Sequence, residues 1–161
     1  MISKEIKKRK VKIDAVDSEM IMLLQKDGRI SNTAMAKILG IAESTVRTRL
    51  KRLIDTKIIQ IVAVSSPFDL GFQVAGNFKI TIDIKKKDTV MKELAAINEL
   101  KYVVLTTGGI DVDADFILSS FEDLEPLIFE KINKIDGIKQ IETSLILQWG
   151  KNVFDWGTVI T

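Results

Sequence analysis

The amino-acid sequence predicts a two-domain α+β protein, with an N-terminal winged helix–turn–helix and a C-terminal ferredoxin-like βαββαβ domain. Three observations support this prediction. Residues 31–53 combine an inward apolar stripe with a basic outer face. A strand–helix–strand pattern occurs twice within residues 74–148. The charge is uneven, since residues 1–64 hold 14 Lys and Arg against 7 Asp and Glu, and residues 65–161 hold 10 against 15. An acidic half repels phosphate, so the first half is the one suited to nucleic acid.

Composition excludes several classes of function. The chain has 161 residues and a hydrophobic content of 46%, enough for two small cored domains. No apolar run reaches the length of a membrane span and no secretory signal is present, so we expect a cytoplasmic protein with no membrane partner. The chain has no cysteine and no histidine, which removes thiolate chemistry and the commonest general base and metal ligand. We therefore expect no cofactor and no enzymatic activity.

The chain begins with a basic stretch and a first helix. Residues 1–12 hold six Lys and Arg against one Glu. A solvated tail explains them, and a basic arm that adds non-specific DNA affinity is compatible with that reading. The domain proper, residues 13–64, opens with a helix from about Asp14 to Lys26. Asp14 is suited to the N-cap, and Asp17 in the first turn favours the helix dipole.

The helix–turn–helix follows. A helix over about residues 32–39 has Ser31 as its N-cap and ends at Gly40, where a left-handed residue is typical. The second helix, over about residues 43–55, is the expected recognition helix. The apolar segment 58–64 then predicts a strand leaving the winged part.

The recognition helix is amphipathic in the way that the DNA major groove requires. Its apolar residues point inward, and its other sides carry the candidate DNA-binding residues Ser44, Thr45, Arg47, Thr48, Arg49, Lys51 and Arg52. We expect the first four near base edges, where an arginine can pair with guanine, and the last three near phosphate. The alternative is a solvated basic helix face with no DNA. A dimer would present two such helices to half-sites about one helical turn apart.

The second domain shows a repeated pattern. A turn-like linker over residues 65–73 precedes a strand at 74–84, in which Phe78, Ile80, Ile82 and Ile84 share one face. The remaining elements are predicted as a helix at 88–97, strands at 101–107 and 111–118, a helix at 122–135 and a strand at 138–148. Two helices cover only one face of such a sheet, so we expect a partner on the other face and at least a dimer.

The C-terminal tail, residues 149–161, holds Trp149, Phe154 and Trp156. Three aromatic side chains in so short a stretch are not expected to stay fully exposed. We expect them to pack against their own domain or at a subunit contact.

Several motifs occur in a fixed order, namely Ile13-Asp14-Ala15-Val16-Asp17, Gln25-Lys26-Asp27-Gly28-Arg29-Ile30-Ser31, Leu70-Gly71, Thr107-Gly108-Gly109-Ile110-Asp111, and Ile135-Asp136-Gly137-Ile138 followed by Glu142-Thr143-Ser144. Together with the helix–turn–helix, they resemble the Lrp/AsnC family, the feast/famine transcription regulators. The resemblance covers about residues 13–148.

This resemblance implies a regulator that binds double-stranded DNA, with a C-terminal domain over residues 74–148 that dimerises and binds a small effector, usually an amino acid. It implies a homodimer that can assemble into tetramers or octamers. In the family the effector lies between domains of neighbouring dimers, near a Gly-x-x-Asp turn and the last strand. The corresponding residues here are Thr107, Gly108, Gly109, Ile110, Asp111, Thr143 and Ser144.

Two departures from the family pattern affect the DNA-binding domain. Ala42 stands where a capping Ser usually precedes the recognition helix, a loss of roughly 1 kcal/mol. Lys57 stands where a Gly usually follows that helix. If the backbone there is left-handed, Lys costs about 1 kcal/mol relative to Gly.

A third departure is the acidic run Asp111, Asp113 and Asp115, which lies on one face if it forms a strand. The spacing resembles a calcium loop, but Phe116 occupies the sixth position, where the sharp turn needs Gly. We expect no metal site. The preferred reading is a solvated strand face for Asp113 and Asp115, and a contact with the effector's ammonium group for Asp111.

These features leave three candidate functions for the protein. The first is a sequence-specific transcription regulator whose activity or assembly responds to a small effector. The second is an architectural DNA-binding protein of low specificity without an effector. The third is an enzyme, because some haem-pathway decarboxylases resemble this family in both domains. They rely on basic and histidine side chains, and this chain has no histidine, so the third reading is disfavoured.

Overall fold

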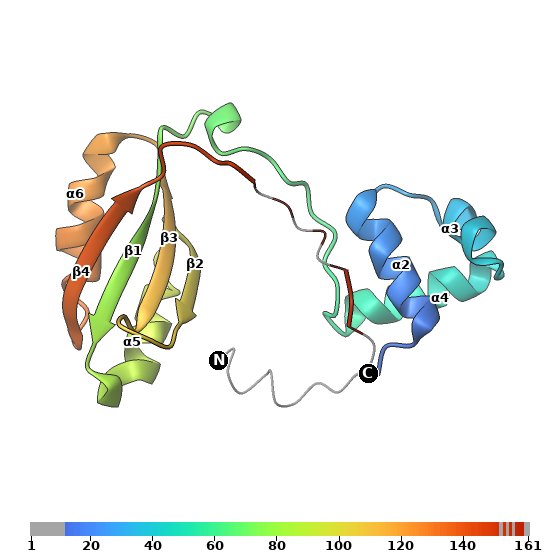
Figure 1. The fold of residues 1–161 in the computed structure, drawn as a ribbon, viewed down its shortest axis with the longest axis horizontal. Helices are drawn as coiled ribbons and strands as arrows, with labels where there is room; N and C mark the ends of the chain where they lie inside the picture. Colours follow the sequence, from blue (N-terminus) through green and yellow to red (C-terminus); the bar gives the residue numbers. More distant parts are fainter. Residues whose placement is uncertain (1–11, 152, 154, 156, 160–161) are drawn as a thin grey trace. The chain divides into compact units, whose positions relative to one another are not determined.

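The computed structural model describes residues 12–151, 153, 155 and 157–159, and the chain divides into two compact units (Figure 1). The helical unit comprises Met1–Val64 together with Lys151–Thr161, and the sheet unit comprises Ser65–Gly150. Within the described residues, no helix is long and apolar enough to cross a membrane. The predicted basic arm lies outside the described residues except for Lys12.

Among its described residues, the helical unit contains three helices, α2 (Ala15–Lys26), α3 (Asn32–Leu39) and α4 (Glu43–Asp55). All three predicted helices are confirmed. Their boundaries are set locally by caps, because the side chain of Asp14 accepts the Asp17 N–H and the side chain of Ser31 accepts the Ala34 N–H. Gly40 ends α3 with φ of 64°, a conformation in which glycine is favoured.

All three helices contribute to the core of this unit. Met20 of α2, Met35 and Ala36 of α3, and Val46 of α4 are buried together. The small side chain of Ala36 permits close packing there. The core therefore holds α4 with its apolar face inward and its polar sides free for other contacts.

The segment after α4 differs from the prediction. Lys57 has φ of 57°, which is a left-handed backbone. The expected cost of about 1 kcal/mol for Lys relative to Gly therefore applies at this position. The strand predicted for residues 58–64 is wrong, because this segment has no regular secondary structure. Its apolar residues favour an extended backbone, but a strand also needs a neighbour for its backbone hydrogen bonds. Ile61, Val62 and Val64 of this segment are exposed.

The sheet unit contains a four-stranded antiparallel sheet in the order β2-β3-β1-β4, which is the ferredoxin-like arrangement. Its elements are β1 (Val74–Ile82), α5 (Lys87–Leu94), β2 (Leu100–Leu105), β3 (Val112–Leu118), α6 (Leu124–Pro126) continued by a π-helical turn (Leu127–Ile132), and β4 (Ile138–Leu145). Short 3₁₀ turns occupy Phe68–Leu70, Ile84–Lys86 and Phe121–Asp123. The predicted order of elements is confirmed, but the predicted helix at 122–135 is divided among three helical types and ends at Ile132.

One face of the sheet packs against the helices (Figure 1). Phe78 of β1 and Phe116 of β3 stack there with ring centroids 4.3 Å apart. A Cβ on Gly76 would collide with the Phe116 ring, so this position requires glycine. Ile84, predicted on this inward face, is 60% exposed because β1 ends at Ile82 and a 3₁₀ turn follows.

The opposite face of the sheet is polar. The Asn77 side chain donates hydrogen bonds to Asp113 at 2.6 Å and to Asp115 at 2.8 Å. Tyr102, on the neighbouring strand β2, is 56% exposed.

In the predicted tail, Trp149 is 36% exposed, and Phe154 and Trp156 lie outside the described residues.

Candidate DNA interface and effector turn

The outer surface of α4 carries the predicted DNA-binding residues in two groups. Ser44, Thr45, Arg47, Thr48 and Lys51 are exposed. Arg47 pairs with Glu43 at 2.9 Å and Lys51 pairs with Asp55 at 2.6 Å, both one turn apart on the helix. Exposed pairs of this kind contribute little to stability, so both cations can exchange their partners for DNA at small cost.

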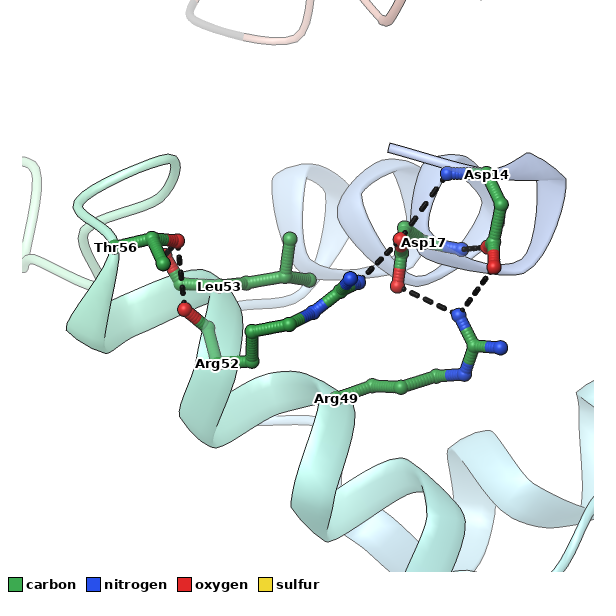
Figure 2. A network of polar contacts seen from close by, with 6 residues as sticks. All are labelled: Asp14, Asp17, Arg49, Arg52, Leu53 and Thr56. Carbon is green, nitrogen blue, oxygen red and sulfur yellow. Dashed lines mark hydrogen bonds and ion pairs between the residues drawn. The ribbon is translucent and has the colours of Figure 1, made fainter. Parts of the chain in front are cut away.

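Arg49 and Arg52 form the second group, and both reach across to α2 (Figure 2). Arg49 Nη1 donates to Asp14 Oδ2 at 2.7 Å and to Asp17 Oδ1 at 2.9 Å. Arg52 Nη2 donates to Asp17 Oδ2. Asp17 has no exposed surface, and its two oxygens each accept a different guanidinium group. The pair of arginines therefore fixes α4 against α2 as well as contributing positive charge.

The ionisation of these groups follows from their partners. Burial raises the pKa of Asp17, but hydrogen bonds from Arg52, from the Asp14 backbone N–H and from Arg49 together hold that pKa below its ordinary value. The backbone N–H of Asp17 and the Arg49 guanidinium lower the pKa of Asp14. Both carboxylates are therefore charged at neutral pH, and the pKa of Arg49 is raised in return.

A hollow of about 460 Å³ lies on this surface, lined by Asp14, Ser44, Thr45, Thr48, Arg49 and Arg52. The structure thus brings five of the seven predicted DNA-binding residues together. The Arg52 Nε–H is buried and has no hydrogen-bond partner among the described residues. Three hydroxyl groups and two guanidinium groups make this hollow suited to a phosphate oxygen.

Sequence reasoning identified Asp14 only as an N-cap and Asp17 only as a first-turn charge that favours the helix dipole. Their second role, as partners of Arg49 and Arg52, requires α2 and α4 to lie side by side. The available signal was the occurrence of two acidic residues one turn apart on α2 and two basic residues one turn apart on α4.

The predicted effector turn joins β2 to β3. The Thr106 N–H donates to the Asp111 carbonyl at 2.8 Å, and the Thr106 hydroxyl donates to the Ile110 carbonyl at 3.0 Å. Gly108, with φ of 121°, adopts a conformation that favours glycine. Asp111 Oδ2 accepts the Ile82 N–H at 2.9 Å, which holds the turn against β1. Its Oδ1 accepts no hydrogen bond from the described residues.

The structure does not bring Thr143 and Ser144 to this turn within one subunit. Both lie on β4, and they pair with Phe78 and Asn77 of β1, whereas Asp111 bonds near Ile82. Four to five residues along a strand correspond to about 15 Å. A site that uses both groups would therefore need more than one subunit.

The acidic run does not form a metal-binding cluster in the part of the chain that the structure describes. Asp113 and Asp115 share the Asn77 amide on the polar sheet face, and Asp111 belongs to the turn. This arrangement agrees with separate roles for Asp111 and for the other two residues.

Comparisons with known proteins are consistent with this geometry. Residues 13–54 match the family model of the AsnC-type helix-turn-helix domain, and residues 78–152 match that of the Lrp/AsnC ligand binding domain. An HTH-type transcriptional regulator of Pyrococcus furiosus is 34% identical over 86% of this chain and 96% of its own length. The regulator FL11 of the same organism is 30% identical over 84% of this chain and 90% of its own length.

Solved structures show the same fold. AsnC of E. coli is 24% identical, with a TM-score of 0.77 over 88% of this chain and 97% of that chain. A transcriptional regulator of Neisseria meningitidis, solved in complex with L-Met, is 18% identical, with a TM-score of 0.78 over 89% of this chain and 95% of that chain.

Proposed function

Since this chain belongs to the Lrp/AsnC family of transcriptional regulators, we propose that it binds specific DNA sequences and that an amino acid modulates its activity or assembly. The observation that carries the DNA part is the surface of α4, where Ser44, Thr45, Arg47 and Thr48 are exposed. Three of these residues line a hollow together with Arg49 and Arg52. These four residues would read base edges, and Arg49, Lys51 and Arg52 would contact phosphate.

The proposed active form is at least a homodimer, with tetramers or octamers as further assemblies. Support comes from membership of the Lrp/AsnC family, and the sheet face opposite the helices is open to a partner. Thr143 and Ser144 can join the turn residues Thr107 to Asp111 only when subunits assemble, so assembly and effector binding would be linked.

The proposed effector contact centres on Asp111. Its Oδ2 is used by the Ile82 N–H, and its Oδ1 would accept the ammonium group of an amino acid. The complex of the Neisseria meningitidis regulator with L-Met supports an amino acid as the ligand class.

The first experiment measures binding to the chain's own upstream DNA and to scrambled DNA, titrated with salt, with and without a mixture of the twenty amino acids. A regulator binds the upstream DNA more tightly, and an amino acid changes that affinity. Equal, steeply salt-dependent binding to both DNAs, unaffected by amino acids, would instead support an architectural protein of low specificity.

Matched substitutions in α4 separate base reading from phosphate binding. Arg47→Ala should reduce the preference for upstream DNA by about 1–3 kcal/mol, because alanine cannot donate the paired hydrogen bonds that recognise guanine. Lys51→Ala should weaken binding to both DNAs alike and lower the salt slope by about 1. If both variants bind as the parent does, α4 is not the recognition helix.

A second pair of variants tests the effector turn. Asp111→Asn keeps a carbonyl oxygen that can accept the Ile82 N–H but removes the charge, so the response to the amino-acid mixture should disappear while DNA binding remains. Asp113→Asn, on the polar sheet face, should keep the response. An unchanged response in Asp111→Asn would remove this residue from the effector site.

A further inference from the structure

Residues 157–159 lie against α2 in the helical unit, although they follow the whole sheet unit along the chain. The Gly157 N–H donates to Gln25 Oε1 at 3.1 Å, and Gln25 Nε2 donates to the Gly157 carbonyl at 3.4 Å. A single side-chain amide therefore binds both main-chain groups of one residue.

The neighbouring residues add specificity to this contact. The hydroxyl groups of Ser18 and Thr158 share a hydrogen bond, and Ser18 is only 2% exposed. Gly157 has φ of 74°, a left-handed conformation in which a side chain is strained. Apart from its chain neighbours, no described residue has an atom within 4 Å of the position of a Cβ on Gly157, so the left-handed backbone is the reason for glycine there.

Apolar side chains surround the polar contact. The segment borders a hollow of about 530 Å³ whose walls come from α2 and from the segment after α4, including Ile21, Leu24, Ile58 and Ile61. Val159 is part of the same lining. Residues of the apolar run at 58–64, which forms no strand, thus line the same hollow as Gly157, Thr158 and Val159.

We propose that this surface of α2 and residues 58–64 is a docking site for residues 157–159 of the same chain. The chain would then connect the sheet unit to the helical unit twice. The 65–73 linker makes the first connection, and the docked segment makes the second. The segment also lies beyond residues 78–152, which the ligand-binding model matches.

A disulfide tests the site directly, because the natural chain has no cysteine. The double variant Ser18→Cys/Thr158→Cys should form a disulfide within one chain under mild oxidation, since the two hydroxyl groups are in contact. The control, Ser18→Cys/Val153→Cys, should remain largely reduced. Non-reducing electrophoresis and mass spectrometry of the full chain distinguish the products. A covalent dimer would show that the segment docks on a second copy, and either no disulfide or equal yields in both variants would also overturn the proposal.

Hydrogen exchange provides a second measurement that needs no cysteine. Gly157→Ala strains the docked backbone, so the amide of residue 157 should exchange about tenfold faster than in the parent, as expected when a hydrogen bond is removed. Gly150→Ala is the matched control, because Gly150 has neither a left-handed φ nor a close neighbour. Equal exchange at residue 157 in both variants would contradict docking.

Discussion

Asp17 is a fully buried carboxylate held between Arg49 and Arg52. Removing one partner of a buried ion pair is costly, because the remaining charges lose their compensation. We expect Asp17→Asn to lower the free energy of unfolding by about 2–3 kcal/mol, toward the smaller end of such effects since both arginines can reach water. Urea unfolding of the full chain measures this change.

Asp55→Asn is the matched control for that variant. Asp55 pairs with Lys51 on the exposed side of α4, with more than half of its side chain accessible. Its substitution should change the free energy of unfolding by less than about 0.5 kcal/mol. Equal effects of the two substitutions would mean that the Asp17 network contributes no more than an ordinary surface pair.

The same residue predicts a pH dependence. Burial raises the pKa of Asp17, but its hydrogen bonds with Arg52, Asp14 and Arg49 lower that pKa by more, so the folded value lies below the ordinary 3.8. A lowered pKa means that the stabilisation is complete above pH 3.8 and declines as the pH falls through the folded value. The parent should lose stability below about pH 4 more steeply than Asp17→Asn. Parallel acid-unfolding curves would exclude this contribution.

Among the elements, α4 lacks a side-chain cap. Ala42 has the extended backbone of an N-cap (φ −66°, ψ 142°) but offers no hydrogen-bond acceptor in its side chain. Ala42→Ser should stabilise the chain by about 1 kcal/mol, because the hydroxyl can accept a free N–H of the first turn. Thermal unfolding measures the gain. Ser31→Ala, which removes the existing cap of α3, should give a loss of similar size. A neutral Ala42→Ser would imply that α4 already has its first N–H groups satisfied.

How far the sequence predicts an element depends on whether its determinants are local. Asp14, Ser31 and Gly40 act within one turn of each helix end, and the helix boundaries they predict match the structure. The apolar run at 58–64 shows the opposite case, because strand formation depends on a partner that no local pattern specifies. Pro126 interrupts the donor series within the predicted helix 122–135, which accords with its mixed helical geometry.

The candidate site likewise combines features that local sequence predicts with features that depend on tertiary packing. Helical periodicity was enough to place Ser44, Thr45, Arg47 and Thr48 on an exposed side of α4. Periodicity could not show that Arg49 is shared with Asp14 and Asp17, because that contact depends on how α2 packs against α4. Thr143 and Ser144 came from the family resemblance alone, and their joint use with the turn remains a prediction about assembled subunits.

At the scale of the whole molecule, charge distribution determines the salt dependence of DNA binding. Residues 1–11 contribute five Lys and Arg against one Glu. Removing them should weaken binding to scrambled DNA and reduce the slope of log affinity against log salt by about 0.9 for each phosphate that the arm neutralises in the parent. Filter binding at several salt concentrations measures the slope. The parent and the shortened chain should show a similar preference for upstream DNA. An unchanged slope would show that the arm makes no phosphate contact.

The helical unit combines residues that precede the sheet unit in the sequence with residues that follow it. The helical unit can therefore be completed only at the end of protein synthesis. During translation, α2 to α4 leave the ribosome first, and the 86 residues of Ser65–Gly150 must follow before Gly157 and Thr158 emerge. A nascent chain therefore exposes Gln25 and the apolar 58–64 run throughout the synthesis of its sheet. Only after the sheet has been made can residues 157–159 cover that surface, so a chain interrupted between Gly150 and Gly157 would carry a complete sheet and an unfinished helical unit.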